Sequence, residues 1–218
     1  TVTPGELVIA YHRGLGDEAA NSEFHCSKLG VPFIGEGAQV TDEMIENCVK
    51  SHSINDTRPQ VGGDRLVTMG VDQGKTGYIS VLEWLFDRHP GTDINAAAIG
   101  KLLWFGKFLE EDWGYLGELM REWQVLACVV DADPNVNDAR RFAKRFHGYV
   151  WLTRYRRGQT AKEIAISEEE TGAPFATVDR TSWLSCTLGR LKTNPPRILL
   201  PRDISFEYRE HVKTYTPL

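Results

Sequence analysis

The sequence lacks a long apolar run, since no stretch of its 218 residues approaches the roughly 18 consecutive apolar residues that cross a membrane. It also lacks a recognisable signal peptide. Its four cysteines, Cys26, Cys48, Cys128 and Cys186, are scattered, with no CxxC pair and no paired histidine ligands. This pattern argues against a zinc site and against a disulfide framework. We therefore expect a protein without a membrane segment that works in a reducing compartment, the cytoplasm.

An excess of basic charge is also missing, because the formal net charge is -5 at pH 7. Any contact with nucleic acid must therefore come from a local basic patch rather than from the field of the whole molecule. Hydrophobic residues make up 41% of the chain, which is enough for a buried core. The length allows one large domain, or one domain with an appendage.

Residues 1–63 differ from the rest of the chain because glycine and proline interrupt them repeatedly. Only two short helices are expected there, over residues 17–29 and 42–51, with Thr41 as the N-cap of the second. Residues 3–6, Thr-Pro-Gly-Glu, are interpreted as one of the interruptions. We therefore predict an N-terminal arm or linker over 1–63, followed by a folded domain over 64–218.

The pattern becomes regular from Asp64 onwards. Strands are predicted over 65–72, 77–86, 96–107, 126–131, 149–155, 162–168, 174–179 and 197–200, and helices over 108–123, 134–147, 181–192 and from about Ser205. The first three strands can form an antiparallel meander, and the connections that contain helices then add parallel strands by right-handed crossovers. The predicted fold class is α/β, with a mixed sheet flanked by helices on both faces.

Two aspartates are unusual because each ends an apolar, strand-like run: Asp72 in the first predicted strand and Asp131 in the fourth. Strand interiors disfavour aspartate, and a carboxylate taken out of water is costly unless a metal ion, a cation or hydrogen bonds compensate. The two strands could lie side by side, about 4.8 Å apart. Both carboxylates could then bind metal ions roughly 4 Å from each other. We predict Asp72 and Asp131 as catalytic, metal-binding residues of a hard-metal site for phosphate chemistry.

Residues 72–76, Asp-Gln-Gly-Lys-Thr, permit two other interpretations. The end of a P-loop is the first, but Met69 occupies the position of its first glycine, and a strand-like run rather than a helix follows. The second is the D-x-G-x-[ST] phosphate loop of sugar kinases and actin-like ATPases. Those proteins need a second such loop, which this sequence does not contain. A phosphotransferase of that group is therefore the alternative function.

Other acidic and imidazole side chains have simpler interpretations. Asp133 precedes Pro134 at the start of a predicted helix, where an aspartate accepts hydrogen bonds from free N–H groups. Asp203 is interpreted as another helix cap, and Asp179 or Thr181 as the cap of the helix over 181–192. Asp133 and Asp203 remain weaker candidates for metal binding. The six histidines are isolated in the sequence and are interpreted as surface or packing residues.

A block of basic residues without an intervening acid stands out in this acidic chain. Its members are Arg140, Arg141, Lys144, Arg145, Arg154, Arg156, Arg157 and Lys162. The simplest interpretation is a solvated helix face and the rim of one strand. The functional interpretation is a DNA-binding patch beside the metal site that contacts the phosphate backbone.

The sequence resembles a known family, the nuclease domain of the large terminase subunit of tailed bacteriophages, which has an RNase H-like fold. Met69–Asp72 resembles the first catalytic strand, and residues 129–134 resemble the second acidic strand end. Residues 23–42 are similar to the stretch that follows the motor ATPase, and residues 178–184 to a late helix start. The order and spacing of these segments carry the resemblance, which runs through most of the chain.

The resemblance implies a metal-dependent endonuclease that cuts concatemeric viral DNA during genome packaging by a two-metal mechanism. It implies that Asp72 bridges two Mg²⁺ or Mn²⁺ ions and that Asp131 binds one of them. The family also has a third carboxylate on a helix after the last strand, and nothing after Asp203 matches it. We expect this carboxylate to lie beyond Leu218, with Asp203 or Asp133 as the other possibilities.

The resemblance also implies the cellular setting. Residues 1–63 would follow an ATPase motor domain that this sequence does not contain, since it has no Walker motif. The implied partners are double-stranded DNA, the motor domain, the small terminase subunit and the portal, in the cytoplasm of the host. Two alternatives stay open besides the phosphotransferase: a non-catalytic DNA-binding module, and a resolvase or integrase of the same fold.

Overall fold

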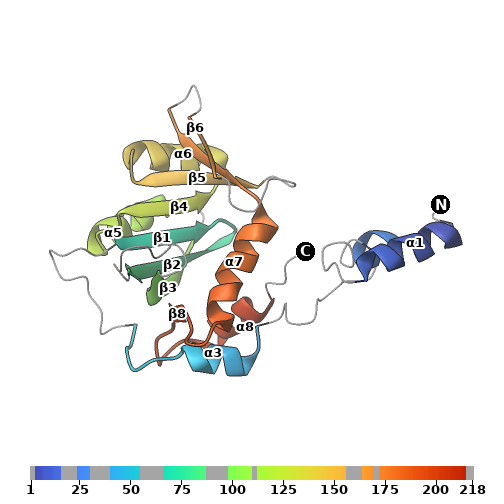
Figure 1. Ribbon diagram of the computed structural model, residues 1–218. Helices are drawn as coiled ribbons and strands as arrows, with labels where there is room; N and C mark the ends of the chain where they lie inside the picture. Colours follow the sequence, from blue (N-terminus) through green and yellow to red (C-terminus); the bar gives the residue numbers. More distant parts are fainter. Residues whose placement is uncertain are drawn as a thin grey trace.

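The computed structural model describes residues 3–15, 24–29, 40–54, 66–86, 98–109, 112–155, 164–168 and 172–214. Its centre is an eight-stranded sheet with the strand order β6-β7-β5-β4-β1-β2-β3-β8 (Figure 1). The strands are β1 Leu66–Asp72, β2 Thr76–Leu85, β3 Ile99–Leu109, β4 Ala127–Asp131, β5 Val150–Tyr155, β6 Ala165–Glu168, β7 Pro174–Val178 and β8 Ile198–Leu199.

The sheet is mixed, as the sequence predicts. β1, β2 and β3 form an antiparallel meander. β4 then pairs with β1 in parallel, followed by β5 and β7, while β6 runs antiparallel at one edge and β8 runs parallel to β3 at the other. Helices cover both faces, so the predicted α/β class, a mixed sheet of antiparallel and parallel strands flanked by helices, is confirmed.

One face of the sheet packs against α5 (Trp113–Glu122) and α6 (Val136–Arg145). Because side chains alternate along a strand, every second residue of the central strands points to this face. Their side chains form one buried cluster with the apolar stripes of both helices, including Leu116 of α5 and Phe142 of α6. Asp112 caps α5 by accepting a hydrogen bond from the Tyr115 N–H at 3.1 Å.

The other face is covered by α3 (Asp42–Cys48), α7 (Arg180–Lys192) and α8 (Phe206–Thr214), and Figure 1 shows α7 lying across it. These helices and the sheet share a second buried cluster, which contains Ile45 and Leu188. The predicted N-cap of α3 is confirmed, since the Thr41 side chain accepts from the Met44 N–H at 3.2 Å.

Part of the range predicted as an arm therefore packs into the domain. The Lys50 N–H donates to the Leu200 carbonyl at 2.8 Å, and Val49 forms a parallel bridge with Leu200. Ile45 and Cys48 are almost completely buried. Residues 40–54 thus complete the core on the α7 side of the sheet.

A helix at the start of the chain corrects the sequence analysis. α1 (Pro4–Gly14) begins at the residues that were interpreted as an interruption. Thr3 and Glu6 form a capping box, and proline in the first turn suits a helix start because its missing N–H would be unpaired there anyway. The predicted helix over 17–29 is described only at 24–29, where the chain forms a π-helix.

The boundary between β3 and α5 also differs from the prediction. The predicted helix begins at residue 108, but β3 continues to Leu109, and Phe108 pairs with Gly77 of β2. The Phe108 ring occupies the space where a side chain at Gly77 would lie, so the glycine lets the strand continue into the core. In the part of the chain that the structure describes, no helix has the length and apolar character that a membrane crossing requires.

Candidate active site

The two predicted aspartates occupy equivalent positions on neighbouring parallel strands. Asp72 is the last residue of β1, and Asp131 is the last residue of β4. Val71 pairs with Val130 in the register of these strands, so the two aspartates follow side by side. Paired residues of adjacent strands point to the same face of a sheet. The prediction that the two strands are neighbours is therefore confirmed, and both carboxylates face α7 and α8.

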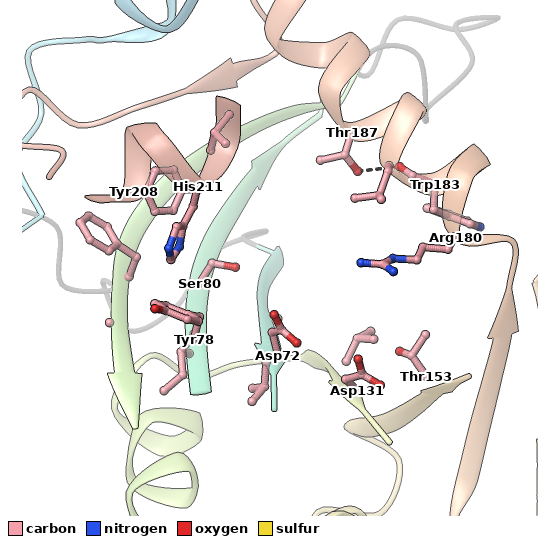
Figure 2. A pocket seen from close by; sticks show the side chains of 18 of the residues that line it. Asp72, Tyr78, Ser80, Asp131, Thr153, Arg180, Trp183, Thr187, Tyr208 and His211 are labelled. Carbon is pink, nitrogen blue, oxygen red and sulfur yellow. Dashed lines mark hydrogen bonds between the residues drawn. The ribbon is translucent and has the colours of Figure 1, made fainter. Parts of the chain in front are cut away.

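Both carboxylates line a cavity of about 660 Å³ between the sheet and the helices α7 and α8 (Figure 2). Its floor is formed by β1 to β5, and its walls by one face of α7 and of α8. In the row of residues that crosses the floor, Tyr78 lies beside Asp72, and Thr153 lies beside Asp131. The cavity therefore presents two acids flanked by two hydroxyl groups.

The cavity disfavours two negative charges. Burial raises the pKa of Asp72, although its carboxylate is accessible from the open side, and the nearby Arg180 and His211 lower it in part. Burial also raises the pKa of Asp131, and repulsion from Asp72 and Asp133 adds to this effect. A bound cation would stabilise the ionised forms of both.

A hydrogen-bond bridge holds the ends of the two strands in place. The Gln73 side-chain amide donates to the Asp131 carbonyl, and its oxygen accepts from the Asn135 N–H at 3.2 Å. The Asp133 N–H donates to Asp131 Oδ1 at 3.3 Å. The turn after β1 is thereby tied to the connection between β4 and α6, which positions the two carboxylates relative to each other.

One polar atom in the cavity lacks a hydrogen-bond partner among the described residues. Thr153 is only 5% exposed, and none of the described residues forms a hydrogen bond with its hydroxyl group. A buried hydroxyl without a partner costs free energy, so its presence beside Asp131 indicates a position where a ligand or water binds.

Two cavity residues, Arg180 and His211, were not predicted from the sequence. Arg180 is the first residue of α7 and extends into the cavity toward the two aspartates (Figure 2). His211 is on α8, where its ring packs edge-on against Tyr78 with the centroids 4.6 Å apart. Residues 178–184 had been identified as a helix start, which was the available indication for Arg180, whereas nothing in the sequence separates His211 from the other histidines.

Contacts at the rim hold α8 against the sheet. Glu207 forms an ion pair with Lys107 of β3 at 2.6 Å, and it accepts a hydrogen bond from the Tyr78 hydroxyl at 3.4 Å. The Phe105 and Tyr208 rings pack with their centroids 4.9 Å apart. α8 therefore forms a wall of the cavity and orients His211 toward the Asp72 side.

The weaker metal candidates lie outside the cavity. Asp203 accepts hydrogen bonds from the Ser53 hydroxyl and, at 3.0 Å, from the Ile54 N–H, and both lower its pKa. The exposed Asp133 contributes its N–H, rather than its carboxylate, to Asp131. Across the described ranges, no group of three or more His, Cys, Asp or Glu residues is arranged to hold a metal ion.

The structure separates the basic block from the aspartates. Arg140, Arg141, Lys144 and Arg145 belong to α6, which covers the opposite face of the sheet. Arg154 stacks on the Phe175 ring at 3.9 Å from its centroid, and Phe175 belongs to that same opposite core. Arg156, Arg157 and Lys162 fall outside the described residues. The described part of the block therefore does not border the cavity.

The turn that resembled a P-loop connects two strands. Gly74 and Lys75 lie between β1 and β2, and Thr76 begins β2 rather than a helix. The rejection of the P-loop interpretation is confirmed. Residues 73–76 do not line the cavity.

Comparisons with known proteins find similarity in structure. No protein-family model matches the sequence, and no curated protein does. The large terminase of the thermophilic bacteriophage D6E aligns with 78% of this chain at 12% identity and a TM-score of 0.39. The human cytomegalovirus terminase nuclease domain, solved after a soak with Mn, aligns with 77% of this chain at 13% identity and a TM-score of 0.43.

The chain spans 35% of the length of the D6E protein and 78% of the cytomegalovirus domain. Both solved structures are of viral terminases, the group of proteins that the sequence resembles.

Proposed function

We propose that this chain is a divalent-metal-dependent endonuclease that hydrolyses phosphodiester bonds of double-stranded DNA. The observation that carries the proposal is the pair of aspartates at the ends of β1 and β4, which share one row of the sheet and face one cavity. Within the described part of the chain, no basic group pairs with either carboxylate at ion-pair distance. Two adjacent acids without an ion-pair contact among the described residues are suited to binding a metal cation.

The residues present fit a hard divalent ion. Asp72 and Asp131 would hold it, because carboxylate oxygens are the ligands that Mg²⁺ and Mn²⁺ prefer. A bound pair of such ions activates water and stabilises charge on phosphate oxygens. The unpartnered Thr153 hydroxyl lies beside Asp131 and is available to a ligand or to an ordered water molecule.

The remaining cavity residues have roles that follow from their positions. The hydrogen bonds of Gln73 fix the ends of β1 and β4 relative to each other. The two carboxylates therefore need little movement to bind a metal ion. Arg180 and His211 approach from the two helices and surround the aspartates with positive or polar groups. α7 and α8 shield the floor of the cavity while leaving Asp72 accessible.

The sequence resemblance supplies the biological role within this proposal. It implies cleavage of concatemeric viral DNA during packaging, in association with an ATPase motor domain, a small terminase subunit and a portal. Association with these partners would compensate for the acidic net charge of -5, which disfavours DNA binding by the isolated chain.

A plasmid-cleavage assay with Mn²⁺, Mg²⁺ or EDTA tests the proposal. We expect metal-dependent nicking and linearisation that Asp72→Ala and Asp131→Ala each reduce by at least about 100-fold, the scale of losing one preorganised electrostatic contact in an active site. Glu118→Ala is the matched control, because this exposed acid belongs to α5, on the opposite face of the sheet, and does not line the cavity. Circular dichroism establishes that each variant folds. Normal cleavage by a folded Asp72→Ala protein would refute the assignment.

A further inference from the structure

Arg180 differs from the other described charged groups of the cavity in having several free hydrogen-bond donors. Its guanidinium lies 5.7 Å from the centre of the Tyr155 ring, and its charge influences both Asp72 and Asp131. None of the described residues accepts a hydrogen bond from Arg180 or forms an ion pair with it. A guanidinium has five N–H donors in a fixed plane, a geometry that matches phosphate oxygens.

Two further features of the same wall suit an anion. Arg180 opens a helix of 13 residues, so the first N–H groups and the positive end of the helix dipole lie at this end of α7. The Thr153 hydroxyl on the cavity floor is buried beside Asp131 and has no hydrogen-bond partner among the described residues (Figure 2). These groups come from β5 and α7, so the fold brings them together around one space.

From this arrangement we infer that Arg180, with the Thr153 hydroxyl opposite, forms an oxyanion subsite that binds a phosphate of the DNA backbone next to the two aspartates. The inference rests on the proposed function and names the residues that position its substrate. Arg180 neutralises the phosphate on the side away from the aspartates, while the Tyr155 ring lies within cation–π distance of the guanidinium. Phosphate binding and metal binding thus use different side chains of one cavity.

The test separates DNA binding from cleavage. In a protein carrying Asp72→Asn and Asp131→Asn, the repulsion between the acids and DNA is removed, and binding to a short duplex DNA is measured in EDTA. We expect Arg180→Gln to raise Kd by about 10-fold and to make the dependence of log Kd on log salt less steep by about 0.9, the value for one lost phosphate contact. Arg180→Lys should keep the salt dependence, because it keeps the charge, and recover only part of the affinity.

Two control variants sharpen the result. Thr153→Val should cause a smaller, few-fold loss of affinity without changing the salt dependence, because a neutral hydroxyl releases no counterion. Arg121→Gln removes an arginine from α5, on the opposite face of the sheet, and should change neither quantity. Thermal denaturation of each variant establishes that the fold is retained, as expected for the exposed Arg180.

The outcomes distinguish this inference from the proposed function. Unchanged affinity and salt dependence in Arg180→Gln would overturn the subsite, even if the wild-type protein cleaves DNA. Loss of cleavage with unchanged binding would overturn it too, because Arg180 would then act only on the aspartates. If the wild-type protein does not cleave DNA while Arg180→Gln weakens binding as expected, the subsite stands and the nuclease assignment fails.

Discussion

The two faces of the sheet are built from alternate residues of the same strands, yet at the ends of β4 and β5 they differ in burial and polarity. On the α5 and α6 side, Val130 and Leu152 are completely buried in a continuous apolar cluster. On the α7 and α8 side, the next residues along these strands, Asp131 and Thr153, face a cavity. Along β4 and β5 the α5 and α6 side therefore provides stability, and the cavity side can carry charged groups because the apolar side holds the strands in register.

Neighbouring valines of β4 provide the most direct test of this comparison. Val130→Ala should lower the free energy of unfolding by about 2–3 kcal/mol, because it removes buried apolar volume and leaves a cavity. Val129→Ala should change it by less than about 0.5 kcal/mol, since Val129 is 44% exposed on the cavity side. Urea denaturation measures both values. Equal losses would show that both faces are packed to the same degree.

The packing of residues 40–54 against the rest of the domain can be weakened at Asp203. Asp203→Asn should lower the free energy of unfolding at pH 7 by about 1 kcal/mol, because it weakens the hydrogen bonds from Ser53 and from the Ile54 N–H. These hydrogen bonds lower the pKa of Asp203 in the folded protein. The stabilisation is therefore present above the unfolded value and is lost as the pH falls through the folded pKa.

A pH series of urea denaturation curves compares the two proteins. The difference between wild type and Asp203→Asn should shrink in acid, at a pH below the ordinary carboxyl pKa of 3.8. A difference that stays constant down to that range would indicate that the carboxylate charge contributes nothing at this position.

Removing a charge from the cavity should stabilise the protein, whereas the substitutions above should destabilise it. Asp131→Asn should raise the melting temperature at pH 7, because burial and repulsion raise the pKa of Asp131 and make its ionised form costly. This cost begins as the pH rises above the ordinary carboxyl pKa of 3.8 and is complete above the raised pKa of the folded protein. After allowance for solvent screening, the gain is on the order of 1 kcal/mol or less.

The same variant separates charge repulsion from metal binding. Mn²⁺ or Mg²⁺ should raise the melting temperature of the wild-type protein, since a ligand that binds only the folded state stabilises it, and should have little effect on Asp131→Asn. Differential scanning fluorimetry with and without each ion measures both effects. A metal-induced shift that persists in Asp131→Asn would place the ion elsewhere.

The smallest expected effect is at Thr153. Thr153→Val replaces a buried, unpartnered hydroxyl by a methyl group of similar size, so stability should be unchanged or should increase by about 0.5 kcal/mol. A loss of more than about 1 kcal/mol would mean that the hydroxyl has a partner in solution, such as an ordered water molecule. Comparison with Ser53→Ala, which removes a hydroxyl that donates to Asp203, controls for the loss of a satisfied group.

Much of the sheet could be predicted from the chain because its strands have short-range patterns. The apolar runs that end at Asp72 and Asp131 and the helical spacing before Trp123 are local properties, and the two strands and the helix are present, although α5 begins later than predicted. α1 was not predicted, although its capping box of Thr3 and Glu6 is also a local pattern. The proline and glycine between these two residues were interpreted as a break in the chain and not as the start of a helix. That error came from the interpretation of the turn residues and not from a lack of information.

Other features depend on contacts between segments far apart in the chain. The docking of residues 40–54 against Leu200 and Asp203 joins positions about 150 residues apart in sequence, and no local pattern specifies it. The convergence of Arg180 and Thr153 on one cavity depends on where α7 packs, as does the separation of the basic α6 from the aspartates. These outcomes follow from packing, which selects among arrangements that the local preferences allow equally.

The sequence by itself determined that Asp72 and Asp131 end apolar strands and that crossovers containing helices place those strands in parallel, because strand period and crossover handedness are properties of local chain geometry. Only the tertiary structure decided which side chains join the two acids. Val71 and Val130 had to pair in register, and α7 had to pack across that face, before Arg180 could reach the same cavity. The physical reason is that strand register and helix packing are selected by the free energy of the whole core. That free energy depends on contacts between segments, so no single segment of the sequence specifies it.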